Sequence, residues 1–179
     1  LAMSTAPGNT SSDLIATTQF LKSSSLFEGL SGPELEHLAA GAKLYHRKKG
    51  SIIYQKDDSS SYLYLIRSGY VVESVYYGAS VDVLVKVRSA GEYFGEMGIL
   101  SSKTYPNTAI ALEDTCLIAI SRSAFLDTIW NNTSVCRVII LELIERLNNS
   151  AQNMVNSMYL DASGRLAFTL VNLTTNNRQ

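Results

Sequence analysis

The chain has 179 residues, of which 46% are hydrophobic and 17% charged, and its formal net charge is −1. This is long enough to bury a core, and it indicates a globular domain with an appendage. The near-neutral charge argues against a surface that grips nucleic acid by itself, and two cysteines are too few for a disulfide framework or a four-thiolate metal site.

The two cysteines, Cys116 and Cys136, fit a reducing compartment, and we interpret them as buried apolar residues. The first residues lack the charged and apolar regions of a signal peptide. The apolar run from Val138 to Ile144 includes Glu142, so it is not expected to span a bilayer. These features predict a cytoplasmic protein with no membrane partner.

Helical signals come first along the chain. Residues 1–12 are small and polar, which indicates a disordered or added arm, and residues 13–22 show a weak helical pattern. Ser31 and Glu34 have the spacing of a capping box, with Pro33 in the first turn. A helix is therefore expected to begin at Ser31.

From residue 44 to residue 120, short runs rich in β-forming residues alternate with glycines and polar turns. Valines occupy every second position from Val81 to Val87, which predicts that this face of the strand is buried. Many short strands at this spacing predict an antiparallel sandwich or barrel. The ten tyrosines fall mostly in these runs and are expected in the core.

Helical spacing returns at Ser121, and Trp130 is expected to be buried on the face of that helix. The segment from Ser134 to Tyr159 contains no glycine or proline, and its apolar residues step by four and three in turn, as in a heptad repeat. We call this set the heptad seam; its members are Ile140, Ile144, Leu147, Ala151, Met154 and Met158. A seam of this length indicates a partner helix, and a two-fold homodimer is the simplest arrangement.

The end of the chain predicts one more helix. Asp161 has the character of an N-cap, and Leu166, Leu170 and Leu173 would form the apolar face. Few residues follow Leu173, so this helix has little of its own to pack against. We expect residues 161–179 to be the start of a further domain whose remainder lies outside this sequence.

Glycines cluster between Gly91 and Gly98, where a strand is expected to give way to a short helix. Backbone N–H groups at a helix start favour an anion, and Glu96 there could accept a hydrogen bond from a ligand hydroxyl. A plain β-turn is the alternative interpretation. The sequence shows no nucleophile elbow, HExxH motif or Walker loop, so we expect no enzyme activity.

The run Phe94-Gly95-Glu96-Met97-Gly98-Ile99-Leu100 resembles the phosphate-binding cassette of cyclic-nucleotide-binding domains in the cAMP receptor protein/FNR family. Other runs match the same family in the right order: Leu26–Leu30, Lys49–Tyr54, Asp58, Tyr62–Gly69 and Leu160–Ala167. Together these matches extend from residue 26 to about residue 173.

The resemblance implies a mainly β fold with flanking helices, namely a double-stranded β-helix of the jelly-roll or β-roll type over residues 13–130. A long dimerisation helix would follow over residues 131–160, and a C-terminal DNA-binding domain would start at residues 161–179. Ligand binding in the β-roll would then be transmitted through the long helix to a helix-turn-helix.

By motif position, Gly95 would offer a backbone N–H to the ligand and Glu96 would bind the ribose 2′-OH. Two residues of the long helix would complete the site from the far side. The full implied ligand-binding set is Phe94, Gly95, Glu96, Met97, Asn107, Thr108, Asn149 and Ser150.

The chain departs from the family at one position, because cyclic-nucleotide binders carry an arginine where this sequence has Asn107. An asparagine cannot offset the phosphate charge, and the lost charge-assisted contact costs about 1.5–3 kcal/mol. The effector is therefore expected to be an unidentified small molecule, and Asn107 argues against cAMP or cGMP. Lys86, Arg88 and Lys103 are candidates to compensate.

Two other functions are compatible with parts of the sequence. A regulatory module of a non-DNA-binding signalling protein would share the β-roll, but it would not need the heptad seam. A small β-barrel enzyme of the cupin kind would need a histidine-rich metal set, whereas His37 and His46 are isolated and are expected on the surface.

Overall fold

The computed structural model describes residues 11–77, 81–101 and 103–159, and it divides the chain into two units, residues 1–136 and 137–179. The predicted helix from Asp161 onward lies outside the described residues. The elements of the described chain are α1 (Ser11–Ser23), η1 (Ser25–Phe27), α2 (Gly32–Gly41), β1 (Lys43–Arg47), β2 (Ile52–Tyr54), β3 (Tyr62–Ser68), β4 (Val71–Tyr77), β5 (Val81–Arg88), β6 (Tyr93–Phe94), α3 (Glu96–Leu100), β7 (Thr108–Ala111), β8 (Thr115–Ser121), α4 (Arg122–Asn131) and α5 (Thr133–Tyr159).

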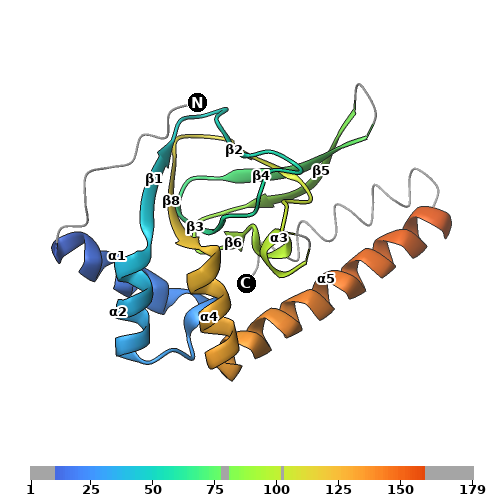
Figure 1. Ribbon diagram of the computed structural model, residues 1–179. Coiled ribbons are helices and arrows are strands. Elements are labelled where there is room, and N and C mark those ends of the chain that lie inside the picture. The colour runs from blue at the N-terminus through green and yellow to red at the C-terminus, as the bar shows by residue number, and fades with distance from the viewer. Residues whose placement is uncertain (1–10, 78–80, 102, 160–179) are drawn as a thin grey trace. The chain divides into compact units, whose positions relative to one another are not determined.

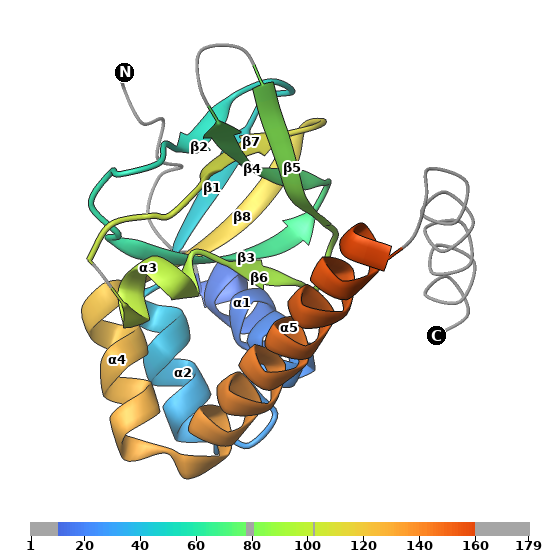
Figure 2. The ribbon, with the colours of Figure 1, turned by 90° about the vertical axis from the view of Figure 1, so that its right-hand side faces the viewer.

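The strands of the first unit form two four-stranded antiparallel sheets, in the orders β1-β8-β3-β6 and β2-β7-β4-β5. The two sheets face each other, and α1, α2 and α4 gather at one end of them (Figures 1 and 2). This arrangement confirms the predicted fold, a mainly β roll with flanking helices and a long C-terminal helix.

Aromatic side chains fill the space between the sheets. The rings of Tyr54 and Tyr105 stack with their centroids 3.6 Å apart, and Phe94 stacks on Tyr64 at 5.3 Å. All four side chains are buried. The prediction that the tyrosines of the strand region form core is confirmed for these residues, whereas Tyr70 is half exposed.

The helices begin where the sequence predicts. Glu34 accepts hydrogen bonds from the backbone N–H of Ser31 at 2.8 Å and from its hydroxyl at 2.6 Å, so α2 starts at the expected capping pair. Ser121 caps α4 by accepting from the backbone N–H of Ala124 at 3.3 Å. The burial expected for Trp130 is wrong, because its side chain is 78% exposed on α4.

The second unit contains most of α5, which runs without a break through the predicted seam. Ile140, Ile144 and Leu147 are 51%, 50% and 70% exposed, and Ala151 is also exposed. Met154 and Met158 belong to the helix, but their side chains lie outside the described residues. The described part of the seam is therefore an apolar stripe open to solvent.

Candidate functional site

The cassette segment turns sharply at Gly95, between β6 and α3. Gly95 has a φ of +89°, and a Cβ added there would lie 3.1 Å from the Tyr62 carbonyl oxygen and 3.2 Å from the Tyr105 ring. Only glycine fits both the backbone angle and the space. The turn brings Glu96, the first residue of α3, to a position where 2% of it is exposed.

The neighbouring cassette residues point in different directions. Phe94 is fully buried in the aromatic core, whereas Met97 is 46% exposed. The short helix α3 has five residues, so its dipole contributes little to binding an anion. The cassette thus places Glu96 in the interior, while Phe94 and Met97 serve core and surface respectively.

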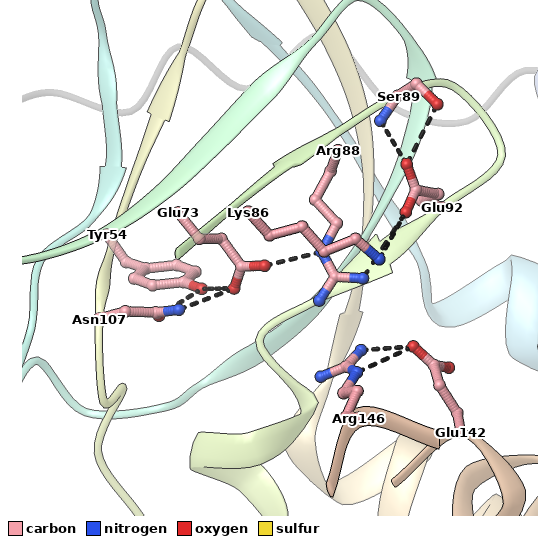
Figure 3. A network of polar contacts seen from close by, with 9 residues as sticks. All are labelled: Tyr54, Glu73, Lys86, Arg88, Ser89, Glu92, Asn107, Glu142 and Arg146. Atoms are coloured by element: carbon pink, nitrogen blue, oxygen red, sulfur yellow. Dashed lines mark hydrogen bonds and ion pairs between the residues drawn. The ribbon is translucent and has the colours of Figure 1, made fainter. Parts of the chain in front are cut away.

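Asn107 and Thr108 lie where the chain enters β7, and both are buried. The Thr108 hydroxyl accepts a hydrogen bond from the backbone N–H of Lys56 at 3.0 Å. The Asn107 amide Nδ2 donates to Glu73 Oε1 at 2.9 Å, and the Asn107 Oδ1 lies 3.2 Å from the Tyr54 hydroxyl, which donates to it (Figure 3). Asn107 therefore contacts a carboxylate of the chain itself.

Glu73 is the centre of this polar network, which Figure 3 shows from close by. Its Oε2 accepts from Arg88 Nε at 2.7 Å, and its Oε1 lies 3.4 Å from the Tyr54 hydroxyl. The side chains of Arg88 and Glu73 are only 4% and 7% exposed. We call Tyr54, Arg88 and Asn107 the donor cluster: Arg88 and Asn107 donate to Glu73, and the single hydroxyl proton of Tyr54 lies within reach of both Glu73 Oε1 and Asn107 Oδ1.

Strand register explains why these charges meet inside the roll. Val71 pairs with Arg88 and Glu73 pairs with Lys86 across β4 and β5, so Glu73 and Arg88 are diagonal neighbours on one face. One extra residue, Val85, lies between the pairs Glu73–Lys86 and Ser74–Leu84, and such a bulge changes the alternation of faces.

The bulge bears on the predicted valine face. At the end of β5, Val87 is 44% exposed and Arg88 is buried, so the expected burial is wrong for Val87. An alternation that begins at Val81 cannot continue unchanged through an extra residue. The side chains of residues 81–85 lie outside the described residues.

The electrostatic environment keeps the Tyr54 hydroxyl protonated. Burial raises the pKa of Tyr54 well above 10, and the nearby carboxylates of Glu73 and Glu96 raise it further, while Arg88 opposes them. Tyr54 is thus a hydrogen-bond donor throughout the physiological pH range. The same interaction places Glu96 within electrostatic range of the donor cluster.

A second carboxylate supports Arg88 from outside the cluster. Glu92 Oε1 lies 3.7 Å from Arg88 and 3.1 Å from Lys86 Nζ, and Glu92 Oε2 accepts from the Ser89 backbone N–H at 2.7 Å. Burial alone would raise the pKa of Glu92, but these donors outweigh it and the pKa is lowered.

The structure places Glu96, Asn107 and Thr108 in the roll interior. Arg88, one of the three basic residues suggested to compensate for Asn107, is also buried there. Glu73 was missed, although a single charge among the apolar residues of a strand is a usable signal. Asn149 and Ser150 are exposed on α5 in the second unit. Their role at the site stays a prediction.

The described residues offer neither a metal site nor a membrane span. No group of three or more His, Cys, Asp or Glu side chains in that part of the chain is arranged to hold a metal ion. Among the same residues, no helix is both long and apolar enough to cross a membrane.

The chain is similar to known regulators. The family model for the cyclic nucleotide-binding domain matches residues 45–132. The chain is 28% identical over 126 residues to the cAMP-activated global transcriptional regulator CRP of Haemophilus influenzae, a match that covers 70% of this chain and 56% of that protein. The chain thus spans little more than half the length of this relative.

Two solved structures have the same fold. The sensor domain of the transcriptional regulator DNR from Pseudomonas aeruginosa aligns with a TM-score of 0.70 at 24% identity, covering 78% of this chain and 93% of that one. The regulatory domain of Toxoplasma gondii PKA, solved with cAMP, aligns with a TM-score of 0.67 at 21% identity, covering 75% and 51%.

Proposed function

Because the chain carries a cyclic nucleotide-binding domain related to that of the cAMP receptor proteins, we propose that it is the effector-sensing and dimerisation part of a CRP/FNR-type transcription regulator. A small-molecule effector binds in the β-roll, at the face that includes Glu96, Asn107 and Thr108. The observation that carries the proposal is that these polar residues are buried in the roll, with Asn107 bonded to Tyr54 and Glu96 close enough to raise the pKa of the same tyrosine.

In this proposal α5 pairs with the same helix of a second copy. The described members of the heptad seam expose apolar side chains along one stripe, and water contact at such a stripe is costly. Asn149 and Ser150 follow the seam residue Leu147 and would contact the effector from α5. Movement of α5 against its twin would carry the signal to a C-terminal helix-turn-helix.

The dimer is tested by sedimentation of the chain and two variants. We expect the unaltered chain to sediment as a dimer and Leu147→Glu to sediment as a monomer, because the substitution places a charge in the apolar seam. Asn148→Glu adds the same charge beside the seam and should remain a dimer. A monomeric unaltered chain would contradict the proposal.

The effector is tested by calorimetry with cAMP, cGMP and uncharged metabolites. We expect weak or no binding of either cyclic nucleotide, because Asn107 offers no positive charge to the phosphate. Asn107→Arg should bind cAMP at least about tenfold more tightly than the unaltered chain. Micromolar binding of cAMP by the unaltered chain would overturn this expectation.

The alternative function is a cyclic-nucleotide-type regulatory module of a signalling protein that does not bind DNA. The fold shared with the Toxoplasma gondii PKA regulatory domain favours this alternative. A chain that binds an effector but stays monomeric at high concentration would support the alternative over the transcription regulator.

A further inference from the structure

We infer that Tyr54, Arg88 and Asn107 form an anion-binding site whose present occupant is the chain's own Glu73 carboxylate. This deepens the proposed function, on which it rests: while Glu73 holds these donors, ligands that carry a phosphate or carboxylate group are kept out of the β-roll, and the effector of the unaltered chain is a molecule without such a group.

The first argument is convergence. Glu73 accepts from Arg88 Nε at 2.7 Å and from Asn107 Nδ2 at 2.9 Å, and the Tyr54 hydroxyl lies 3.4 Å away. These donors come from β5, from the start of β7 and from β2, three segments far apart in the sequence. Donors that meet from separate strands on one carboxylate make the same pattern that holds a bound anion.

The second argument is burial. Arg88 is the only cation among the buried residues that the structure describes, and an incoming anion has no other buried positive charge to approach in this part of the chain. Glu73 already forms an ion pair with Arg88. A free anion must therefore displace a carboxylate that is tethered on β4 and competes at an effective concentration of about millimolar or higher.

The third argument concerns Asn107. Its amide nitrogen donates a hydrogen bond to Glu73 Oε1 at 2.9 Å, and its amide oxygen accepts from the Tyr54 hydroxyl, so both ends of the amide are engaged inside the cluster. A ligand anion that reaches Asn107 therefore meets the negative charge of Glu73 at contact distance, and like charges repel strongly inside a protein. Binding of a free anion is therefore weakened twice: Asn107 offers it no positive charge, and the Glu73 carboxylate repels it.

The test uses small anions as probes. Glu73→Ala removes the carboxylate and leaves space at the donor cluster. We expect the Tm of this variant to rise by several degrees with acetate or inorganic phosphate, relative to chloride at the same ionic strength. The unaltered chain should not respond. An identical response of both proteins would overturn the inference.

Two further variants assign the response to the cluster. Glu73→Ala combined with Arg88→Leu should lose the anion response, and a response that persists would overturn the inference. Glu92→Gln removes a carboxylate that lies 3.7 Å from the same arginine but contacts neither Tyr54 nor Asn107. Its Tm should therefore be as insensitive to acetate and phosphate as the Tm of the unaltered chain. A gain equal to that of Glu73→Ala would show a general charge effect instead.

Loss of a buried ion-pair partner is destabilising, so Glu73→Ala could fail to fold. Glu73→Gln keeps the shape of the side chain and removes only the charge. Its Tm should then respond to phosphate more than that of Glu92→Gln, and the absence of a difference would count against the inference.

The same variants separate the inference from the proposed function. Glu73→Ala should bind cAMP at least about tenfold more tightly than the unaltered chain. Response to acetate and phosphate without response to cAMP would uphold the anion site and count against a nucleotide effector. The sedimentation result for α5 is independent of both.

Discussion

At the scale of single residues, Gly95 and Gly91 have nearly the same backbone angle and very different surroundings. Their φ angles are +89° and +91°, but an added Cβ meets close neighbours only at Gly95. The pair therefore separates the cost of the backbone angle from the cost of the contact.

We expect Gly91→Ala to lower the free energy of unfolding by about 1–2 kcal/mol, through the left-handed backbone alone. Gly95→Ala should cost about 2–4 kcal/mol, because crowding against Tyr62 and Tyr105 adds to the same conformational term. Urea unfolding measures both. Equal losses would show that the tight packing around Gly95 relaxes at no cost.

Glu92 gives a pH-dependent contribution at the same scale. The pKa of Glu92 is lowered in the folded protein from an ordinary value of 4.5. Its ionised form therefore stabilises the fold fully at pH values above 4.5. The contribution is lost as the pH falls through the lowered pKa.

We expect Glu92→Gln to be less stable than the unaltered chain at pH 7, because the variant loses the ion pair with Lys86. The difference should persist down to about pH 5 and then shrink as the carboxyl of the unaltered chain is protonated. Unfolding at a series of pH values measures it. A difference that grows toward low pH would contradict the lowered pKa.

At the scale of elements, the capping of α2 makes a simple prediction. Ser31→Ala removes the hydroxyl that bonds to Glu34 and should lower the free energy of unfolding by about 1 kcal/mol. Ser23→Ala, whose hydroxyl bonds to a carbonyl at the exposed end of α1, is the matched control and should cost less. If urea unfolding gave equal losses of unfolding free energy for the two variants, the Ser31 cap would stabilise the protein no more than an ordinary exposed hydrogen bond.

The elements also show what sequence patterns can and cannot predict. Glycine spacing and apolar runs predicted an antiparallel sandwich or barrel, and the family resemblance implied the roll. A capping pair predicted the start of α2, and helical spacing predicted the start of α4. The bulge at Val85 in β5 could not be predicted, because it depends on pairing with β4 and not on β5 alone. Arg88 and not Val87 reaches the interior because Arg88 pairs with the buried Val71 and shares its face with Glu73.

The candidate site likewise contains residues that the sequence could identify and residues that it could not. Glu96, Asn107 and Thr108 could be proposed from the sequence because short continuous runs that match the family contain them. Glu73 and Arg88 come from two strands, and only the register of those strands makes them neighbours. The burial predicted for Trp130 is wrong for a related reason. Helical spacing predicts which residues share a face of α4, but it does not predict whether another element packs on that part of the face.

At the scale of the whole molecule, the boundary between the two units falls within α5. The proposed dimer of α5 makes the stability of the fold depend on protein concentration. We expect the Tm to rise with protein concentration, because association stabilises only the folded chain. Leu147→Glu should have a Tm that does not depend on concentration. Thermal unfolding over a hundredfold range of concentration measures both, and a constant Tm for the unaltered chain would contradict the dimer.

The exposure of Trp130 has a practical consequence for all these measurements. It is the only tryptophan in the chain, and it is 78% exposed on α4. Its emission is therefore already that of a solvated indole, so denaturation changes its colour little and circular dichroism is the better signal. A blue shift in the native protein would instead report that the Trp130 indole is shielded from water.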